Sequence, residues 1–221
     1  GGNGGGGLTG FTLPSGPPAG QDDDAVKELL VDYNEKFKNA EPTLFRDQLI
    51  EQMLATLISK NKPNVLLKGS AGVGKTKVVE DIARRIALGD SLIPDMLKDH
   101  TIYELPITNL IAGSGIVGAL EEKVQAVVDF ASNPKNKAIL FIDEIHQITG
   151  GSTSHSDPTS RKISQILKPA LARGDMSVIG ATTSNESRAF DDDPAFARRF
   201  TPLIVDELTS DQTLAVLHNI R

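Results

Sequence analysis

Hydrophobic residues recur at every third or fourth position in several stretches of this 221-residue chain. That spacing is typical of helices with one buried face. It predicts helices over residues 25–39, 46–60, 75–88, 118–131 and 160–173. The chain ends in a further helical pattern.

Short, mostly apolar runs separate these predicted helices. They lie at residues 65–67, 101–107, 138–142, 177–181 and 203–205. Apolar runs of this length are typical of strands that are buried on both faces of a sheet. Strands that alternate with helices predict an α/β fold built on a parallel sheet.

The first 24 residues have a different character. Nine of the 20 glycines lie within residues 1–20, and residues 1–24 contain no lysine or arginine. Such a segment has too little apolar surface to offset the entropy that is lost on ordering. We expect residues 1–24 to form a flexible linker. An expression scar is the alternative for the first few residues.

One stretch carries the strongest chemical pattern. Gly69-Ser70-Ala71-Gly72-Val73-Gly74-Lys75-Thr76 fits G-x-x-x-x-G-K-[ST], the phosphate-binding loop, between a predicted strand and a predicted helix. Backbone N–H groups of such a loop surround phosphate oxygens, and the positive end of the helix dipole faces the same anion. We expect Lys75 to reach the β- and γ-phosphates and the Thr76 hydroxyl to bind Mg²⁺.

Two acidic residues, Asp143 and Glu144, follow the predicted strand at 138–142. Parallel strands place their carboxyl ends at one edge of a sheet, where ligands bind. Asp143 can then hold Mg²⁺, and Glu144 can accept a proton from an attacking water. A solvated strand end without chemistry explains the pair equally well on local grounds.

Two further patterns are less specific. Thr182 and Thr183 follow the strand at 177–181, where a hydroxyl can contact the γ-phosphate, although threonine also suits a strand end for its β propensity alone. Arg198 and Arg199 can act as arginine fingers, which neutralise charge on a phosphoryl group, including one bound to a neighbouring subunit. Solvated charge or local salt bridges are the alternative for the arginine pair.

Composition narrows the classes of function. The chain has 23 basic and 29 acidic residues, a formal charge of −6, which argues against nucleic-acid binding driven by net charge. Without residues 1–24 the chain is nearly neutral, and that argument weakens. The absence of cysteine excludes disulfides and cysteine nucleophiles. No apolar run approaches the roughly 18 residues of a membrane span, and we expect a cytoplasmic protein.

Together these residues resemble the first AAA+ module of the Clp-type protein unfoldases and disaggregases. The likeness extends over nearly all of residues 25–221, through the stretches 66–76, 141–146, 167–174, 180–183 and 198–200. The run Leu167-Lys168-Pro169-Ala170-Leu171-Ala172-Arg173-Gly174 is the most specific of them, because nucleotide hydrolysis alone does not require it.

The resemblance implies an α/β P-loop NTPase fold, with a five-stranded parallel sheet of order 5-1-4-3-2 flanked by helices. It implies that residues 69–76 are the Walker A loop and that Asp143 and Glu144 form Walker B. It also implies that Thr183 is the sensor-1 residue and that Arg198 and Arg199 are paired arginine fingers. Thr43-Leu44-Phe45 matches the segment that lines the adenine pocket. The cofactors would be ATP and Mg²⁺, bound at each subunit interface of a hexameric ring.

The same resemblance implies three parts of the chain. Residues 1–24 would be the linker, 25–207 the AAA+ large subdomain, and 208–221 the start of a helical lid that continues past Arg221. The substrate-gripping pore loop matches Gly113-Ser114-Gly115-Ile116-Val117-Gly118, with Gly115, Ile116 and Val117 at its tip. The family usually has an aromatic and a basic residue there. An aliphatic Ile116 offers an extended chain less contact area, so the departure bears on protein threading and not on hydrolysis.

The function predicted on these grounds is an ATPase motor that couples ATP hydrolysis to protein unfolding or remodelling. The expected partners are identical subunits and a protein substrate, with a peptidase as an option; nucleic acid is less favoured, and no membrane is expected. One alternative is an AAA+ ATPase of the loader type that acts on nucleic-acid assemblies. The other is a non-hydrolysing, ATP-dependent assembly module, which has little use for the carboxylate of Glu144.

Overall fold

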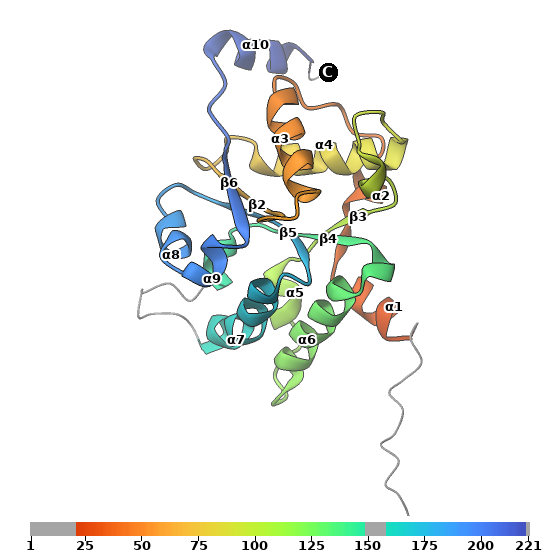
Figure 1. The fold of residues 1–221 in the computed structure, drawn as a ribbon, viewed down its shortest axis with the longest axis vertical. Coiled ribbons are helices and arrows are strands. Elements are labelled where there is room, and N and C mark those ends of the chain that lie inside the picture. Colours follow the sequence, from red (N-terminus) through yellow and green to blue (C-terminus); the bar gives the residue numbers. More distant parts are fainter. Residues whose placement is uncertain (1–20, 149–157, 220–221) are drawn as a thin grey trace, which may run out of the picture.

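A six-stranded sheet forms the centre of the chain, with helices on both faces (Figure 1). The computed structural model describes residues 21–148 and 158–219. The strands cross the sheet in the order β1-β3-β4-β5-β2-β6. Their bounds are β1 Val31–Asp32, β2 Asn64–Lys68, β3 Thr101–Glu104, β4 Ala138–Ile142, β5 Ser177–Thr182 and β6 Phe200–Ile204.

Five of these strands form the expected parallel sheet. The pairs β3–β4, β4–β5, β5–β2 and β2–β6 are all parallel, and numbered among themselves the five strands have the order 5-1-4-3-2. The expected number of strands is wrong, because β1 adds a sixth, antiparallel to β3. β1 has only two residues. The buried Leu30 and Tyr33 flank it and fit the helical spacing of the hydrophobic residues around them, so the sequence pattern does not indicate a strand here.

Two layers of helices cover the sheet. Helices α2, α3 and α4 lie on one face, and α1, α5, α6 and α7 lie on the other (Figure 1). Helices α8 and α9 connect β5 to β6, and α10 follows β6. The bounds are α1 Gln21–Lys27, α2 Tyr33–Phe37, α3 Asp47–Leu57, α4 Lys75–Leu88, α5 Ile107–Ile111, α6 Ala119–Ser132, α7 Pro158–Arg173, α8 Ser187–Asp191, α9 Pro194–Ala197 and α10 Ser210–Asn219, with 3-10 turns η1 Asp95–Leu97, η2 Pro134–Asn136 and η3 Ile145–Ile148.

The central strand β4 shows why its sequence is a continuous apolar run. All five of its residues are buried. Ile139 and Phe141 belong to the core under α3 and α4, whereas Leu140 and Ile142 belong to the core that α6 and α7 cover. Successive side chains of a strand point to opposite faces, and here both faces of the strand are buried under helices.

Helix limits agree best with the sequence where an end is chemically marked. Helix α4 has the predicted limits, and Gly89, which has a left-handed φ of +67°, caps its carboxyl end. Glycine adopts this conformation without the steric cost that a side chain adds. Helices α3 and α6 also match the predictions to within a few residues.

The predicted helix over 25–39 is wrong, because the structure divides it into α1, β1 and α2. Asp32 is extended, and its side chain accepts a hydrogen bond of 3.0 Å from the backbone N–H of Glu35, so it caps α2 at this point. Residues 21–24, which were assigned to the linker, belong to α1. Acidic residues are favourable in the first turn of a helix. Near the other end of α1, the side chain of Val26 is buried in the core.

Part of one prediction falls on residues that the structure does not describe. Residues 1–20 of the expected linker lie outside the described residues, as do residues 149–157, which precede the helix predicted over 160–173. The helix predicted over 160–173 begins two residues earlier, because α7 starts at Pro158, and proline suits the first turn of a helix. Among residues 21–148 and 158–219, no helix has the length and apolar character to cross a membrane.

Replacement of Phe141 tests the core between β4 and helices α3 and α4. Phe141 is fully buried and packs with its ring centroid 5.8 Å from that of Tyr33. We expect Phe141→Ala to lower the free energy of unfolding by about 3–5 kcal/mol, because the lost aromatic ring leaves a cavity. Urea denaturation followed by circular dichroism measures this change. Ile204→Ala is the matched control, since Ile204 is 68% exposed; equal losses in the two variants would contradict the assignment of Phe141 to the core.

Candidate functional site

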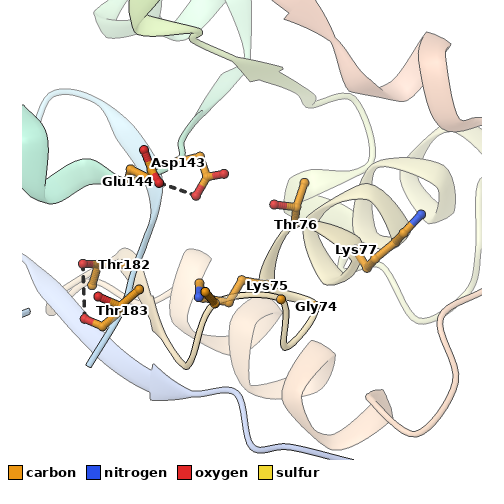
Figure 2. A pocket seen from close by; sticks show the side chains of 10 residues that line it. Gly74, Lys75, Thr76, Lys77, Asp143, Glu144, Thr182 and Thr183 are labelled. Atoms are coloured by element: carbon orange, nitrogen blue, oxygen red, sulfur yellow. Dashed lines mark hydrogen bonds between the residues drawn. The ribbon is translucent and has the colours of Figure 1, made fainter. Parts of the chain in front are cut away.

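A cavity of about 370 Å³ lies at the carboxyl edge of the parallel sheet. It brings together the loop after β2, the acidic pair after β4 and the threonines at the end of β5, as Figure 2 shows. The sequence places these three segments far apart. The lining residues are Ala71, Gly72, Gly74, Lys75, Thr76, Lys77, Asp143, Glu144, Thr182 and Thr183.

Gly69 and Gly74 meet two different requirements of the loop from Gly69 to Gly74. A Cβ on Gly69 would lie 2.8 Å from the backbone oxygen of Val205 and 2.9 Å from Cγ1 of Val73, so a side chain there would displace the loop. Gly74 begins α4 with a left-handed φ of +104°, a conformation that L side chains rarely adopt. The loop therefore leads directly into the amino end of α4, where backbone N–H groups attract anions.

Lys75 projects from the first position of α4 into this cavity (Figure 2). Its Nζ donates hydrogen bonds to the carbonyl oxygens of Gly69, at 2.7 Å, and Ser70, at 3.1 Å. Burial lowers the pKa of Lys75, and the negative charges of Asp143 and Glu144 oppose that shift. The Lys75 ammonium group thus faces two carboxylates in the cavity, an arrangement that suits a phosphate chain and a metal ion.

A buried arginine supports the loop from behind. Arg46 donates a hydrogen bond of 3.0 Å from Nη2 to the carbonyl of Val73. Burial lowers the pKa of Arg46, and the nearby Asp206 opposes the shift. Sequence reasoning did not assign Arg46 a role, although its position directly after Thr43-Leu44-Phe45 placed it near the expected nucleotide site.

Asp143 and Glu144 lie in a sharp turn after β4. The Oδ1 atom of Asp143 accepts a hydrogen bond of 2.9 Å from the backbone N–H of Glu144. Glu144 has a left-handed φ of +49°, and non-glycine residues in this region cluster at functional sites. Its Oε2 accepts a hydrogen bond of 2.9 Å from Nε2 of Gln147. Both carboxylates line the cavity opposite Lys75 and Thr76 (Figure 2).

The two threonines after β5 have different surroundings. Thr182 is buried, and its Oγ1 lies 2.9 Å from Nδ1 of His146. Thr183 is half-buried, and its Oγ1 accepts a hydrogen bond of 3.3 Å from the backbone N–H of Glu186. Both line the cavity, so the structure brings the expected sensor residue and its neighbour to the site together.

A second cavity of about 870 Å³ adjoins the first, and Gly74 and Lys77 line both. Thr43 and Leu44, from the segment that the resemblance assigns to the adenine pocket, line this cavity, and the Thr43 hydroxyl donates a hydrogen bond of 3.1 Å to the carbonyl of Lys77. Phe45 does not line it. Its left-handed φ of +63° accompanies a side chain that is 48% exposed.

The lining of this second cavity also includes residues that the sequence did not mark. They come from α2, α4, α10 and the loops that follow α2 and precede α10, and no motif identifies them because only the folded chain brings these segments together. The lining residues are Phe37, Ala40, Glu41, Pro42, Thr43, Leu44, Arg46, Val73, Gly74, Lys77, Glu80, Asp81, Leu208, Val216, His218 and Asn219.

The two adjacent arginines do not share one environment, and neither lines the two cavities. Arg199 is half-buried, and its Nε donates a hydrogen bond of 2.8 Å to the carbonyl of Ala172 at the end of α7. Its guanidinium lies against Gly174, where a Cβ would approach Nη1 to 2.7 Å. The side chain of Arg198 is exposed and forms no hydrogen bond or salt bridge with residues that the structure describes.

Residues 167–174, the most specific stretch of the resemblance, contact the segment that carries Arg198 and Arg199. Lys168 forms a salt bridge of 2.5 Å with Asp193 and lies over the ring of Phe196, 5.7 Å from its centroid. Together with the bond from Arg199 to Ala172, these contacts fix α9 against α7. The run therefore holds the arginines in place relative to the sheet.

The loop at residues 113–118 presents an apolar tip between α5 and α6. Ile116 is 77% exposed and Val117 is 99% exposed. The N–H of Ala119 donates a hydrogen bond of 3.1 Å to the carbonyl of Ile116, which closes the turn just after the tip. Gly115 has open space around it. The three residues stand apart from both cavities.

Comparison with known proteins places this geometry in one family. The family described as "ATPase family associated with various cellular activities (AAA)" matches residues 65–207. Among solved structures, the S. cerevisiae Hsp104-ADP complex has a TM-score of 0.75 and 34% sequence identity, over 87% of this chain and 32% of that chain.

Curated proteins with similar sequences belong to the Clp group. The chaperone protein ClpB of Mycoplasmoides gallisepticum is 41% identical over 182 residues, which is 82% of this chain and 25% of that protein. The ATP-dependent Clp protease ATP-binding subunit ClpE of Lactococcus lactis subsp. lactis is 37% identical over 207 residues, 93% of this chain and 27% of that protein. The chain spans about a quarter of the length of the curated relatives it matches.

The arginine pair allows a matched test of the two environments. We expect Arg199→Ala to lower the free energy of unfolding by about 1–3 kcal/mol, because it leaves the Ala172 carbonyl without its charged donor. Arg198→Ala should change it by less than about 0.5 kcal/mol, as exposed substitutions generally do. Urea denaturation of both variants measures the difference. Equal effects would contradict the distinct environments described above.

Proposed function

Because the chain belongs to the AAA family of ATPases and is a Clp-type AAA+ module, we propose that it is the ATPase motor module of a ring-forming protein remodeller. Nucleotide binding is common to this family. The observation that carries the proposal is the pair of adjoining cavities, in the first of which Lys75 lies opposite Asp143 and Glu144.

The two cavities suit the two ends of ATP. The first has the loop, the amino end of α4 and Lys75, which together attract the phosphate chain. The second is larger, and Leu44 and Val216 are among its apolar lining, so it suits the base and ribose. Since Gly74 and Lys77 line both cavities, one ligand can extend from one to the other.

The oxygen donors present also suit Mg²⁺. The Thr76 hydroxyl and the Asp143 carboxylate both line the first cavity, and Mg²⁺ prefers such hard oxygen ligands together with substrate phosphates and water. Within the described ranges, no group of three or more His, Cys, Asp or Glu side chains could hold a metal ion, which fits an ion that arrives with the nucleotide. When bound, Mg²⁺ would neutralise charge on the phosphates.

Hydrolysis would use Glu144 as the general base. Glu144 orients a water and accepts its proton while the water oxygen attacks the γ-phosphorus. The bond between that phosphorus and the β,γ-bridging oxygen breaks, and ADP leaves with the electron pair. Thr183, with Thr182 beside it, would contact the γ-phosphate or the water, and Lys75 would stabilise negative charge on the phosphates.

The remaining parts of the proposal involve other molecules. The exposed Arg198 is suited to act on the nucleotide of a neighbouring subunit in a hexameric ring, with Arg199 as its support.

The apolar tip formed by Gly115, Ile116 and Val117 is suited to contact an unfolded protein substrate. One similar solved structure is an Hsp104:casein complex, and ClpE is described as a protease subunit, so a protein substrate and a partner peptidase fit this group. The division into a core over residues 25–207 and a lid that starts at residue 208 is also part of the proposal.

The amide replacement Glu144→Gln tests the general base. We expect it to retain ATP binding, because the loop and Lys75 are unchanged, and to lower turnover in the full-length protein by at least about 100-fold, the lower end of what a general base contributes. Phosphate release measures turnover, and fluorescent-nucleotide titration measures binding. Glu51→Gln is the control, since Glu51 is an exposed carboxylate on α3. Turnover at the wild-type rate in Glu144→Gln would sink the assignment.

Removal of Arg198 tests the action between subunits. In the assembled full-length protein, we expect Arg198→Ala to lower turnover by about 100-fold or more, because an arginine finger stabilises charge in the transition state. Nucleotide affinity should stay within about threefold, since Arg198 lies outside both cavities of its own chain. Size-exclusion chromatography shows whether the ring still forms. An assembled Arg198→Ala variant with wild-type turnover would exclude Arg198 as the finger.

A further inference from the structure

The 3-10 turn η3 directly follows Glu144 and lies between β5 and α7. Its two isoleucines, Ile145 and Ile148, are buried, whereas Gln147 is exposed. The backbone N–H of Gln147 donates a hydrogen bond of 2.9 Å to the carbonyl of Glu144. This bond closes the turn around the glutamate.

Contacts with β5 fix the position of this turn. Ile145 packs so closely on Gly180 that a Cβ there would lie 2.8 Å from Cδ1 of Ile145. On the next residue, Nδ1 of His146 lies 2.9 Å from Oγ1 of the buried Thr182. The side chains of η3 therefore have a defined position relative to the threonines that line the phosphate cavity.

From this fixed turn, Gln147 contacts the carboxylate of Glu144. Its Nε2 donates a hydrogen bond of 2.9 Å to Oε2 of Glu144. The carboxylate accepts no other side-chain hydrogen bond from residues that the structure describes, so its second oxygen is available to a water. The left-handed φ of +49° at Glu144 already constrains the backbone, and the amide constrains the free end of the side chain.

We propose that Gln147 is a positioning residue for hydrolysis, whose side-chain amide holds the Glu144 carboxylate so that one oxygen faces the attacking water. The inference rests on the proposed function, because it requires Glu144 to act as the general base. A base must lie within hydrogen-bond reach of the proton that it abstracts. Gln147 supplies that placement from the neighbouring turn without contacting the nucleotide cavities, whose lining does not include it.

The test is steady-state ATP hydrolysis by the full-length protein with Gln147→Met, which keeps the side-chain length and removes the donor. We expect kcat to fall about tenfold and KM to stay within about twofold, since misplacement of a catalytic group by about 1 Å costs up to 100-fold in rate. Gln125→Met is the matched control. Gln125 is also exposed and also donates from Nε2 to a carboxylate, at 2.8 Å to Oδ1 of Asp129 on α6, and its loss should leave kcat unchanged.

Two further variants separate positioning from a general effect on structure. Gln147→Glu keeps the shape but places a carboxylate beside Glu144, so kcat should fall at least as far as in Gln147→Met, at an unchanged melting temperature. In a Glu144→Gln background, Gln147→Met should lower the residual rate no further, because residues that act as a unit are non-additive.

The outcomes separate this inference from the proposed function. Wild-type kcat in Gln147→Met, a rise in KM without a fall in kcat, or an equal fall in Gln125→Met would each overturn the positioning role while Glu144→Gln still abolished turnover. Unchanged turnover in Glu144→Gln would instead overturn the general base itself, and with it the proposed hydrolysis.

Discussion

The parallel pairing of β2, β5 and β4 is the constraint on which the site depends. In this register Lys68 pairs with Thr182, and Ile142 pairs with Gly180. The three strands therefore end at one edge, and whatever follows them in the sequence meets there. Both faces of these strands are buried under helices, so a one-residue shift in register would move apolar side chains out of two cores at once. The geometry of the site is thus stabilised by the packing of the whole domain.

Within that frame, the polar groups of the site are held by backbone contacts at close range. The approach of Gly69 to Val205 and the bond from Arg46 to Val73 fix the phosphate loop from two sides. Arg46 is buried, and a desolvated guanidinium is costly unless an acceptor meets it. The carbonyl of Val73 and the charge of Asp206 meet that requirement. A loop that is fixed before the nucleotide arrives has less entropy to lose on binding.

The sequence predicted the elements that are determined by residues close together in the chain. The limits of α4 followed from helical spacing and Gly89, and β4 followed from a run of five apolar residues. It could not predict β1, because two residues carry no periodicity and their pairing with β3 is a long-range contact. Likewise, a motif grouped Phe45 with Thr43 and Leu44, but Phe45 does not line the second cavity with them. Its left-handed backbone, which no neighbouring residue signals, accompanies the exposure of its ring to solvent.

The distribution of charge indicates which parts of the proposed chemistry need a second subunit. Lys75 and Lys77 bring two positive charges to the lining of the first cavity, and Asp143 and Glu144 bring two negative ones. Lys77 points away from the acidic pair (Figure 2) and forms a salt bridge with Glu80. A triphosphate adds several negative charges, and more negative charge develops on its oxygens in the transition state. Within the described ranges, the lining offers only Lys75 to face that charge. The metal ion and an arginine from outside the chain are the remaining cations in the proposal. The proposal assigns the arginine to the exposed Arg198 of a neighbouring subunit, next to Arg199, which is bonded to the end of α7.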